Sequence, residues 1–179
     1  MAKCTAGLYR PGMSDDASMP WSGRAWHATS REHAPRSPDG LDAYLRQALD
    51  RNIKEGGRFN PPGEFGAVYL SLDPETPILE SDNPEVLLVL DGQLGRVLDL
   101  ANPAISESWG LSAAEFCDDE HGPCQQAARK IRRARYEAVR YPSAQGHGLN
   151  LVVFWDIREP GSGFALVGRE QVADDQAAT

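Results

Sequence analysis

The chain has 179 residues, of which 41% are apolar and 25% charged, and its formal net charge is −8 at pH 7. These values predict one globular domain that is long enough to bury a core. The acidic balance argues against general nucleic-acid binding, which usually needs a basic surface. No apolar run approaches the ~20 residues of a membrane span, no signal-peptide core is present, and three cysteines do not indicate a disulfide scaffold. We therefore expect a cytoplasmic protein.

Polarity divides the chain into a patterned middle and two polar ends. We expect residues 1–22 to be a loosely ordered arm, residues 23–169 to form the folded domain, and residues 170–179 to be a flexible tail. No internal repeat is present, so nothing indicates a repeat architecture.

The first clear helix begins after Ser37, a typical N-cap residue, with Pro38 at its first position. Its apolar residues recur at helical spacing from Leu41 to Ile53, and Gly56 is a typical stop. Shorter helices are expected at about 104–109 and 112–117, and a longer one from 123 to about 135.

Runs of β-branched, aromatic and aliphatic residues predict the strands. Asp91-Gly92 is a typical hairpin turn and is expected to join two of them. The predicted strands cover residues 25–28, 67–72, 86–90, 97–100, 137–141, 149–155 and 164–167. Strands and helices mix without a regular βαβ alternation, and no glycine-rich phosphate loop is present. This pattern disfavours a Rossmann or P-loop domain.

The stretch 56–80 places three chemically distinct side chains at equal intervals, at positions 58, 69 and 80. Arg58 follows a glycine pair, Tyr69 lies on a predicted strand, and Glu80 follows an acidic turn. Thr76 before Pro77 is expected to cap a short helix with Glu80 in its first turn. A cation, an aromatic ring and a carboxylate thus come from three successive elements, and we expect them to converge on one cleft.

Four sequence blocks resemble the RES domain, the toxin of bacterial toxin–antitoxin pairs whose partner is an Xre-type helix-turn-helix antitoxin. The blocks GGRFNPPG, VYLS, the glutamate of TPILE and RYPSAQGHGLNLVVF stand in the family's order, and the resemblance covers roughly residues 25–164. It implies an α+β, ADP-ribosyltransferase-like fold, in which two small, mainly antiparallel sheets surround an NAD cleft and are flanked by helices.

The resemblance also implies a toxin that consumes NAD+ as its substrate and so arrests growth. It would cleave the nicotinamide–ribose bond by hydrolysis or phosphorolysis, and an Xre-type antitoxin would cover the cleft. No metal, membrane or direct nucleic-acid contact is expected. One alternative is an ADP-ribosyltransferase that modifies a cellular protein, and another is a non-catalytic interaction module.

Four residues receive roles from the resemblance. Glu80 would stabilise positive charge on the ribose, as a carboxylate does in glycoside cleavage. Tyr69 would stack on the nicotinamide, and Arg58 would contact the phosphates or the ribose. Ser143 would orient the nicotinamide ribose. Structural explanations remain open for each of them, such as an ordinary strand aromatic for Tyr69 and a turn former for Ser143.

The sequence departs from the family at the first functional arginine. His27 occupies the best-matching position, with Arg24 and Arg31 on either side. His27 would then bind the adenosine side of NAD+, and the two arginines are further candidates for that contact.

Cys117, His121 and Cys124 are possible soft metal ligands, with Cys4 or His147 as a fourth. Their spacing is not that of a common zinc site, so an acidic loop between helices is the favoured interpretation.

Five basic residues crowd one predicted helix: Arg129, Lys130, Arg132, Arg133 and Arg135. A solvated helix face is the usual explanation, and contact with nucleic acid or an acidic partner is the alternative.

Overall fold

The structure is a computed structural model that describes residues 17–145 and 148–172. The strands are β1 (Ser18–Thr29), β2 (Val68–Ser71), β3 (Val86–Asp99), β4 (Ala138–Pro142), β5 (Leu149–Val153) and β6 (Gly163–Gln171). The helices are α1 (Leu41–Glu55), α2 (Thr76–Leu79), α3 (Pro103–Ser108) and α4 (Gly122–Arg133), with short 3-10 turns at Pro38–Gly40, Ala114–Phe116 and Trp155–Ile157. The predicted helix is confirmed as α1, in which Leu41, Tyr44 and Leu45 are buried and Gly56 follows the last residue. Its expected start differs, because residues 38–40 form a 3-10 turn and Ser37 makes no side-chain cap hydrogen bond.

All six strands belong to one sheet in the order β1-β2-β5-β4-β3-β6, and β1 also pairs with β3. The sheet therefore closes on itself. The β3–β4 pair is parallel and the other pairs are antiparallel. The structure thus confirms a mixed α+β fold, but one closed sheet stands where two small sheets were expected.

The length of β3 explains this difference. Asp91-Gly92 does not turn a hairpin, because β1 pairs with β3 on both sides of these residues, with Arg24 opposite Asp91 and Gly23 opposite Gly92. The other edge of β3 pairs first with β6 and then with β4. A turn signal is local, and pairing along both edges overrides it. One continuous strand therefore serves both halves of the sheet.

The sheet also extends beyond the expected domain limits at both ends. Ser18 pairs with Leu98, and Gln171 pairs with Val86. Polar composition did not reveal these strand ends, because backbone pairing with β3 supplies the hydrogen bonds that hold them. The rest of the expected arm and tail, residues 1–16 and 173–179, lies outside the described residues.

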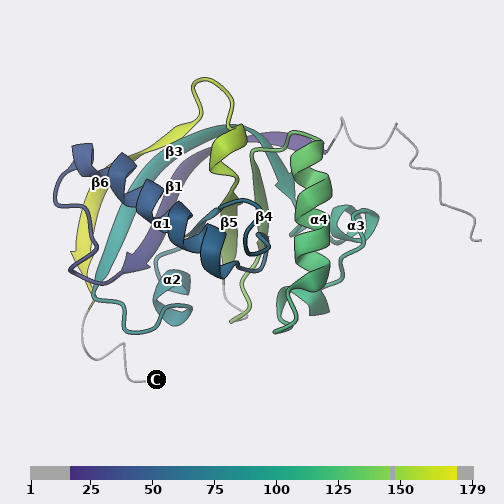
Figure 1. Ribbon diagram of the computed structural model, residues 1–179, viewed down its shortest axis with the longest axis horizontal. Coiled ribbons are helices and arrows are strands. Elements are labelled where there is room, and N and C mark those ends of the chain that lie inside the picture. The colour runs from purple at the N-terminus through teal and green to yellow at the C-terminus, as the bar shows by residue number, and fades with distance from the viewer. Residues whose placement is uncertain (1–16, 146–147, 173–179) are drawn as a thin grey trace, which may run out of the picture.

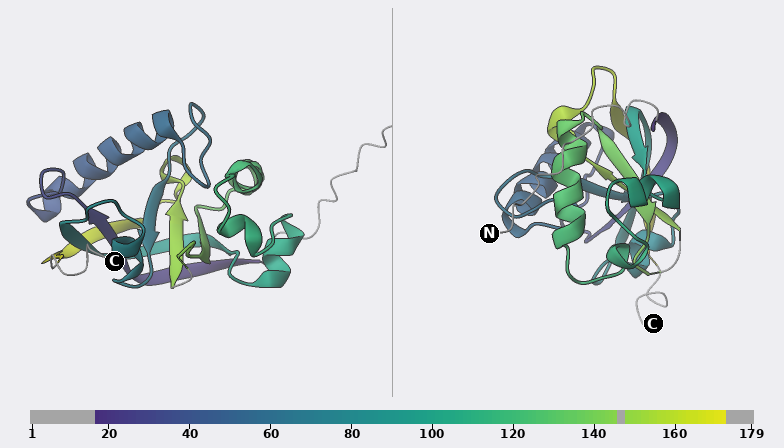
Figure 2. Two further views of the ribbon diagram at one scale, coloured as in Figure 1. Left: turned by 90° about the horizontal axis from the view of Figure 1, so that it is seen from below. Right: turned by 90° about the vertical axis from the view of Figure 1, so that its right-hand side faces the viewer.

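Two hydrophobic cores cover opposite faces of the sheet. On β2, Val68 and Leu70 join the core that includes Leu45 of α1, whereas Tyr69 packs against the second core, which includes Ile131 of α4. Figure 1 shows α1 crossing the sheet and α4 standing beside β4 and β5, and Figure 2 gives the same arrangement from two other sides. Alternation along a strand therefore decides which helix a side chain meets.

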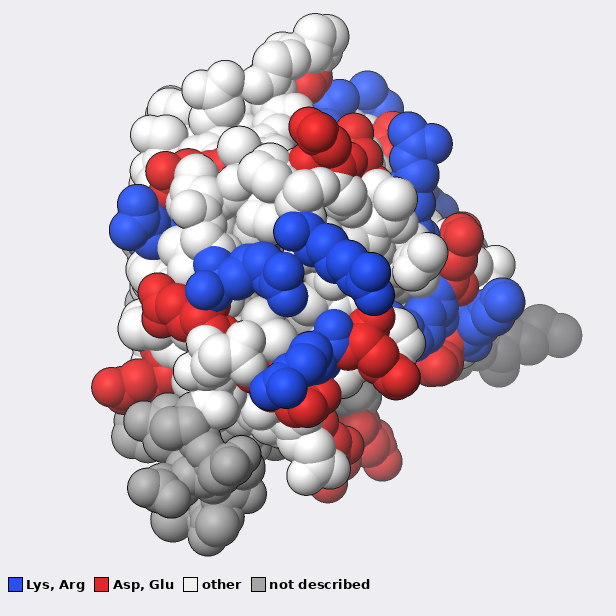
Figure 3. Space-filling view, turned by 90° about the vertical axis from the view of Figure 1, so that its left-hand side faces the viewer, with Lys and Arg blue, Asp and Glu red and all other residues white. Residues whose placement is uncertain are grey.

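Basic and acidic side chains are interspersed on the face drawn in Figure 3, so that face carries no large patch of a single sign. Among the described residues, no helix is both long and apolar enough to cross a membrane.

Candidate functional site

The carboxylate of Glu80 is held by three hydrogen bonds from two neighbouring segments. The side-chain amide of Asn150 donates to both carboxylate oxygens at 2.9 Å, and the hydroxyl of Ser143 donates to Oε1 at 2.5 Å. Ser71 in turn donates to the amide oxygen of Asn150 at 2.8 Å. We call Glu80, Ser143, Asn150 and Ser71 the carboxylate network. Glu80 itself lies at the surface, but its acid group is turned towards buried partners and is fixed in orientation.

The single turn of α2 places Glu80 next to Ser143 and Asn150. Asp73 caps the helix, because its carboxylate accepts hydrogen bonds from the backbone N–H groups of Glu75 and Thr76. Glu80 follows the last helical residue and donates its N–H to the Thr76 carbonyl at 3.0 Å. The expected first-turn position of Glu80 is therefore wrong, because Asp73 starts the turn earlier than a Thr76 cap would. An acidic side chain at the carboxyl end of a helix interacts unfavourably with the helix dipole, so dipole stabilisation does not explain the position of Glu80.

Gly148 allows the segment between β4 and β5 to approach α2 closely. Its φ is +61°, and a Cβ atom there would lie 1.8 Å from the Asp73 carboxylate. The carbonyl of Gly148 also accepts the N–H of Ser143 at 3.3 Å. Only glycine fits this contact, which holds Ser143 beside the element that carries Glu80.

Strand register places one row of side chains across four strands. Trp26 on β1 is the Cα partner of Ser71 on β2, which pairs with Asn150 on β5, which pairs with Tyr141 on β4. Paired residues point to the same side of a sheet. Trp26 and Tyr141 therefore flank the carboxylate network from its two sides.

The hydroxyl of Tyr69 is used to hold the loop that carries Arg58. It donates to the side-chain oxygen of Asn60 at 2.7 Å and accepts the backbone N–H of Phe59 at 2.9 Å. Gly57 packs so closely that a Cβ atom would lie 2.7 Å from this hydroxyl. Burial raises the pKa of Tyr69, so the phenol remains neutral and cannot act as a base.

Tyr141 is a buried phenol whose pKa depends on charged and polar groups around it. Burial raises the pKa of its phenol well above the usual value, Tyr69 and Glu80 raise it further, and Arg58 lowers it. Arg58, Tyr69 and Glu80 thus each influence this phenol, but none of the three lines either of the two cavities described below. The Arg58 guanidinium donates to the carbonyls of Glu115 at 3.1 Å and Asp118 at 2.8 Å. Within residues 17–145 and 148–172, no carboxylate lies at ion-pair distance from Arg58.

His27 lies on the opposite face of the sheet from the carboxylate network. Its neighbour Ala25 belongs to the core under α1, and its ring meets that of Tyr44 of α1 at 5.8 Å. The ring Nδ1 donates to the backbone carbonyl of Tyr69 at 2.8 Å. Burial lowers the pKa of His27, so the ring is neutral at pH 7. These contacts do not bring the His27 side chain to Glu80.

The two neighbouring arginines have different surroundings. Arg31 donates through its backbone N–H to Glu85 at 2.8 Å and through its guanidinium to Gln171 at 2.9 Å, at the end of β6. Arg24 instead shares the sheet face of Trp26 and donates through Nε to Asp91 at 3.1 Å. Of the candidates around the first position, only Arg24 is placed on the face of the network.

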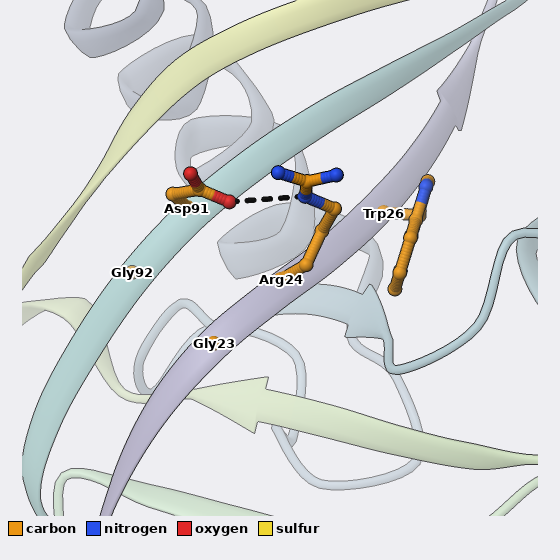
Figure 4. Close-up of a pocket in the computed structure, with 5 residues that line it drawn as sticks. All are labelled: Gly23, Arg24, Trp26, Asp91 and Gly92. Carbon is orange, nitrogen blue, oxygen red and sulfur yellow. Dashed lines mark hydrogen bonds and ion pairs between the residues drawn. The ribbon is translucent and has the colours of Figure 1, made fainter.

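A shallow, largely open cavity of about 620 Å³ lies beside Trp26. Figure 4 draws the residues that line it. The cavity is lined by Gly23, Arg24, Trp26, Asp91 and Gly92. A second cavity of about 380 Å³ lies near Trp21 and Pro160. Glu80 lines neither of them, but Trp26 connects the larger cavity to the row that contains Ser71 and Asn150.

Comparison with known proteins matches residues 24–167 to the family described as the RES domain. This range covers most of the chain. The chain belongs to the RES domain family.

Curated relatives include the protein called NAD(+) phosphorylase MbcT, from Mycobacterium tuberculosis and Mycobacterium bovis. Each is 28% identical over 121 residues, and the match covers 59% of this chain and 65% of the relative. The match thus spans just under two thirds of the length of these relatives. Among solved structures, the M. tuberculosis MbcT–MbcA toxin–antitoxin complex includes a similar chain, with a TM-score of 0.67 and 21% identity, covering 90% of this chain and 92% of that one. This likeness supports the RES domain fold.

Three residues of this RES domain site were missed at the sequence level: Asn150, Tyr141 and Trp26. Asn150 gave a usable signal, because it is a polar residue in a strongly apolar strand and is only 4% exposed. Such a residue needs a hydrogen-bond partner, and here that partner is Glu80. Tyr141 and Trp26 gave no such signal, since their places depend on strand register.

Among the described residues, the possible metal ligands Cys117, His121 and Cys124 do not form a group that could hold a metal ion. Burial raises the pKa of the Cys124 thiol to about 11, and its sulfur lies 3.4 Å from the Glu115 carbonyl. Within the part of the chain that the structure describes, no three His, Cys, Asp or Glu side chains are grouped to hold a metal ion. Cys4 and His147 lie outside that part.

The basic helix α4 makes contacts within the RES domain. Arg129 forms a forked ion pair with Glu64, and Arg132 forms one with Asp156, with N–O distances between 2.6 and 3.2 Å. These arginines therefore fasten α4 to neighbouring loops.

Proposed function

We propose that this RES domain is the toxin of a toxin–antitoxin pair and that it cleaves the nicotinamide–ribose bond of NAD+. The observation that carries the proposal is the fixed Glu80 carboxylate, which Asn150 holds by both oxygens and Ser143 by one. The activity for which the MbcT relatives are named, NAD+ phosphorylase, supports NAD+ as the substrate. The same proposal includes an ADP-ribosyltransferase-like fold around this site.

In the proposed reaction, the bond between ribose C1 and the pyridinium nitrogen breaks, and its electron pair leaves with nicotinamide. The departing ring becomes neutral, so no strong general acid is required. Positive charge develops on the ribose, and an oriented carboxylate stabilises it most in the transition state. We assign this role to Glu80, while Asn150 and Ser143 hold it in place.

Three residues fit the remaining parts of the substrate. Arg58 has no carboxylate partner among the described residues, so its charge is available for the pyrophosphate or the ribose hydroxyls. Tyr69 has its hydroxyl occupied, so its contribution is restricted to its ring, which suits stacking on nicotinamide. Ser143 keeps its hydrogen bond to Glu80, and its hydroxyl oxygen can accept a hydrogen bond from the nicotinamide ribose.

We propose inorganic phosphate as the acceptor, because the relatives are called phosphorylases. A phosphate oxygen then forms the new bond to C1, which gives ADP-ribose 1″-phosphate and nicotinamide. Incubation with NAD+ labelled in its adenylate tests this assignment. The phosphorylated product in phosphate buffer supports it, ADP-ribose in every buffer indicates water as the acceptor, and label on protein indicates ADP-ribosyl transfer.

An antitoxin that covers the site completes the proposal. The solved complex of the similar chain contains an antitoxin called MbcA. We propose an Xre-type partner for this chain and expect the pair to act in the cytoplasm, where NAD+ is consumed. Co-expression with the neighbouring gene should restore growth and NAD+ levels, and failure to do so would contradict the pairing.

A further inference from the structure

From the larger cavity and its place beside the carboxylate network, we infer that Trp26 and Arg24 form the subsite for the ADP half of the dinucleotide. This inference rests on the proposed function, because Glu80 fixes where the nicotinamide ribose must lie. It assigns a residue, Trp26, that neither the family blocks nor the spacing of positions 58, 69 and 80 indicated.

Register gives the distance between the two parts of the site. Trp26 stands two strands away from Asn150 on the same face, and strands are about 4.8 Å apart, so the two residues lie roughly 10 Å apart. Arg24 lies two residues further along β1, roughly 7 Å beyond Trp26. An extended dinucleotide whose ribose sits at Glu80 can reach this far with its phosphates and adenosine.

The cavity has the size and composition that a nucleotide needs. Its volume of about 620 Å³ falls within the usual range of small-molecule sites, which is about 300–1,000 Å³. Two of its lining residues are the paired glycines Gly23 and Gly92, which contribute backbone to its wall. A Cβ atom at Gly92 would lie 2.3 Å from the Phe164 ring, so this glycine makes room for Phe164. Figure 4 shows the indole of Trp26 and the guanidinium of Arg24 projecting from the same strand, next to each other.

The two side chains offer complementary chemistry. Trp26 is only half-buried, so its indole is accessible at the cavity and can stack on adenine. Arg24 is 54% exposed, and Asp91 engages it through Nε alone, which leaves the terminal nitrogens for phosphate oxygens. Tyr69 lies two residues before Ser71 on β2, and the proposed function assigns it and Arg58 to the nicotinamide end.

The test compares NAD+ with nicotinamide mononucleotide, which has the same scissile bond but lacks the adenylate. Trp26→Ala should raise the KM for NAD+ by about 5- to 150-fold, the usual value of one base–aromatic stack, with a much smaller change in kcat. Trp26→Phe should recover most of the loss. For the mononucleotide, Trp26→Ala should change kcat/KM by less than about two-fold, since the missing contact is to the adenylate.

Controls separate this inference from the function on which it rests. Trp155→Phe changes a tryptophan that lies outside the cavity, beside Arg158, and should alter neither substrate's KM. Arg24→Gln should fold normally, because an exposed ion pair adds little stability, and should raise the KM for NAD+ alone. Equal losses for both substrates, or an unchanged KM for NAD+ in Trp26→Ala and Arg24→Gln, would overturn the subsite.

If the wild-type protein cleaves neither substrate, a binding measurement still tests the subsite. The proposed function would then fail, and calorimetry with ADP-ribose would test the subsite by itself. Weaker binding to Trp26→Ala and Arg24→Gln than to the wild type would support the subsite. Equal binding to all three proteins, or no binding to any, would reject it.

Discussion

The side-chain amide of Asn150 donates to both carboxylate oxygens of Glu80, each at 2.9 Å. The two residues lie on different elements, and 70 positions separate them. Because Ser71 fixes the amide oxygen of Asn150, the amide nitrogen must face Glu80. Asn150, a strand residue with no proposed role in the reaction, thus sets the orientation of the proposed catalytic acid Glu80.

Replacing Asn150 by alanine should therefore reduce kcat for NAD+ cleavage by about 10- to 100-fold, because the carboxylate loses its alignment. Asn150→Asp should reduce it at least as much, since a second carboxylate would repel Glu80. Steady-state kinetics measures kcat for each variant, and circular dichroism verifies that the variants are folded. Ser71→Ala is the matched control, and it should show a smaller loss, because it removes only the indirect support.

Gly148→Ala should uncouple α2 from the segment that carries Ser143. A Cβ atom would overlap the Asp73 carboxylate, at 1.8 Å, and would add strain at φ +61°. We expect a loss of stability above 2 kcal/mol, roughly the sum of a steric shift and left-handed strain, together with loss of activity. Thermal unfolding and NAD+ turnover measure the two effects.

Gly110→Ala is the control for that strain. Its φ is +79°, but nothing lies within 4 Å of the added Cβ atom. It should cost about 1 kcal/mol and leave activity intact. Equal effects of the two substitutions would show that the contact with Asp73 does not matter.

Glu137 should make folding sensitive to acid. It is fully buried, and its carboxylate accepts the N–H groups of Gly95 at 2.5 Å, Arg96 at 2.8 Å and Glu159 at 2.5 Å. Burial alone would raise its pKa, but these hydrogen bonds and one from Ser162 outweigh burial and lower it below 4.5.

Because the folded-state pKa lies below the unfolded one, Glu137 stabilises the fold above about pH 4.5, and this contribution is lost as the pH falls through the folded-state pKa. Glu137→Gln should lower the free energy of unfolding at pH 7 by about 2–4 kcal/mol and should flatten the acid limb of the stability profile. Urea unfolding between pH 3 and pH 7 provides the test. A variant with the same acid limb as the wild type would exclude this residue as its source.

Arg132 should contribute to stability rather than to nucleic-acid binding. Its guanidinium pairs with Asp156 and lies 4.0 Å from the centre of the Phe65 ring. Arg132→Ala should destabilise the protein by about 1–2 kcal/mol, whereas the exposed Arg133→Ala should change it by less than about 0.5 kcal/mol. If both variants unfold like the wild type but lose an interaction with nucleic acid, the structural interpretation of α4 is wrong.

The sequence predicted α1 and the strand around Tyr69 because periodicity and turn residues are local properties. The family blocks also placed Glu80 and Ser143 in one expected NAD+ site, and the structure shows these two side chains hydrogen-bonded. The sequence did not predict that His27 faces α1, because a shift of one residue along a strand reverses the face. The joining of two expected strands into β3 was missed for a related reason, since pairing partners are distant in the chain.

The central claim is that the Glu80 carboxylate promotes cleavage of the nicotinamide–ribose bond, and release of nicotinamide from NAD+ by wild type and Glu80→Gln measures it most directly. Glutamine preserves the size of the side chain and removes the charge, while Glu107→Gln alters an exposed acid elsewhere as the control. We expect nicotinamide release to fall at least 100-fold in Glu80→Gln and to be unchanged in Glu107→Gln. Release at the wild-type rate by a folded Glu80→Gln protein would contradict the account.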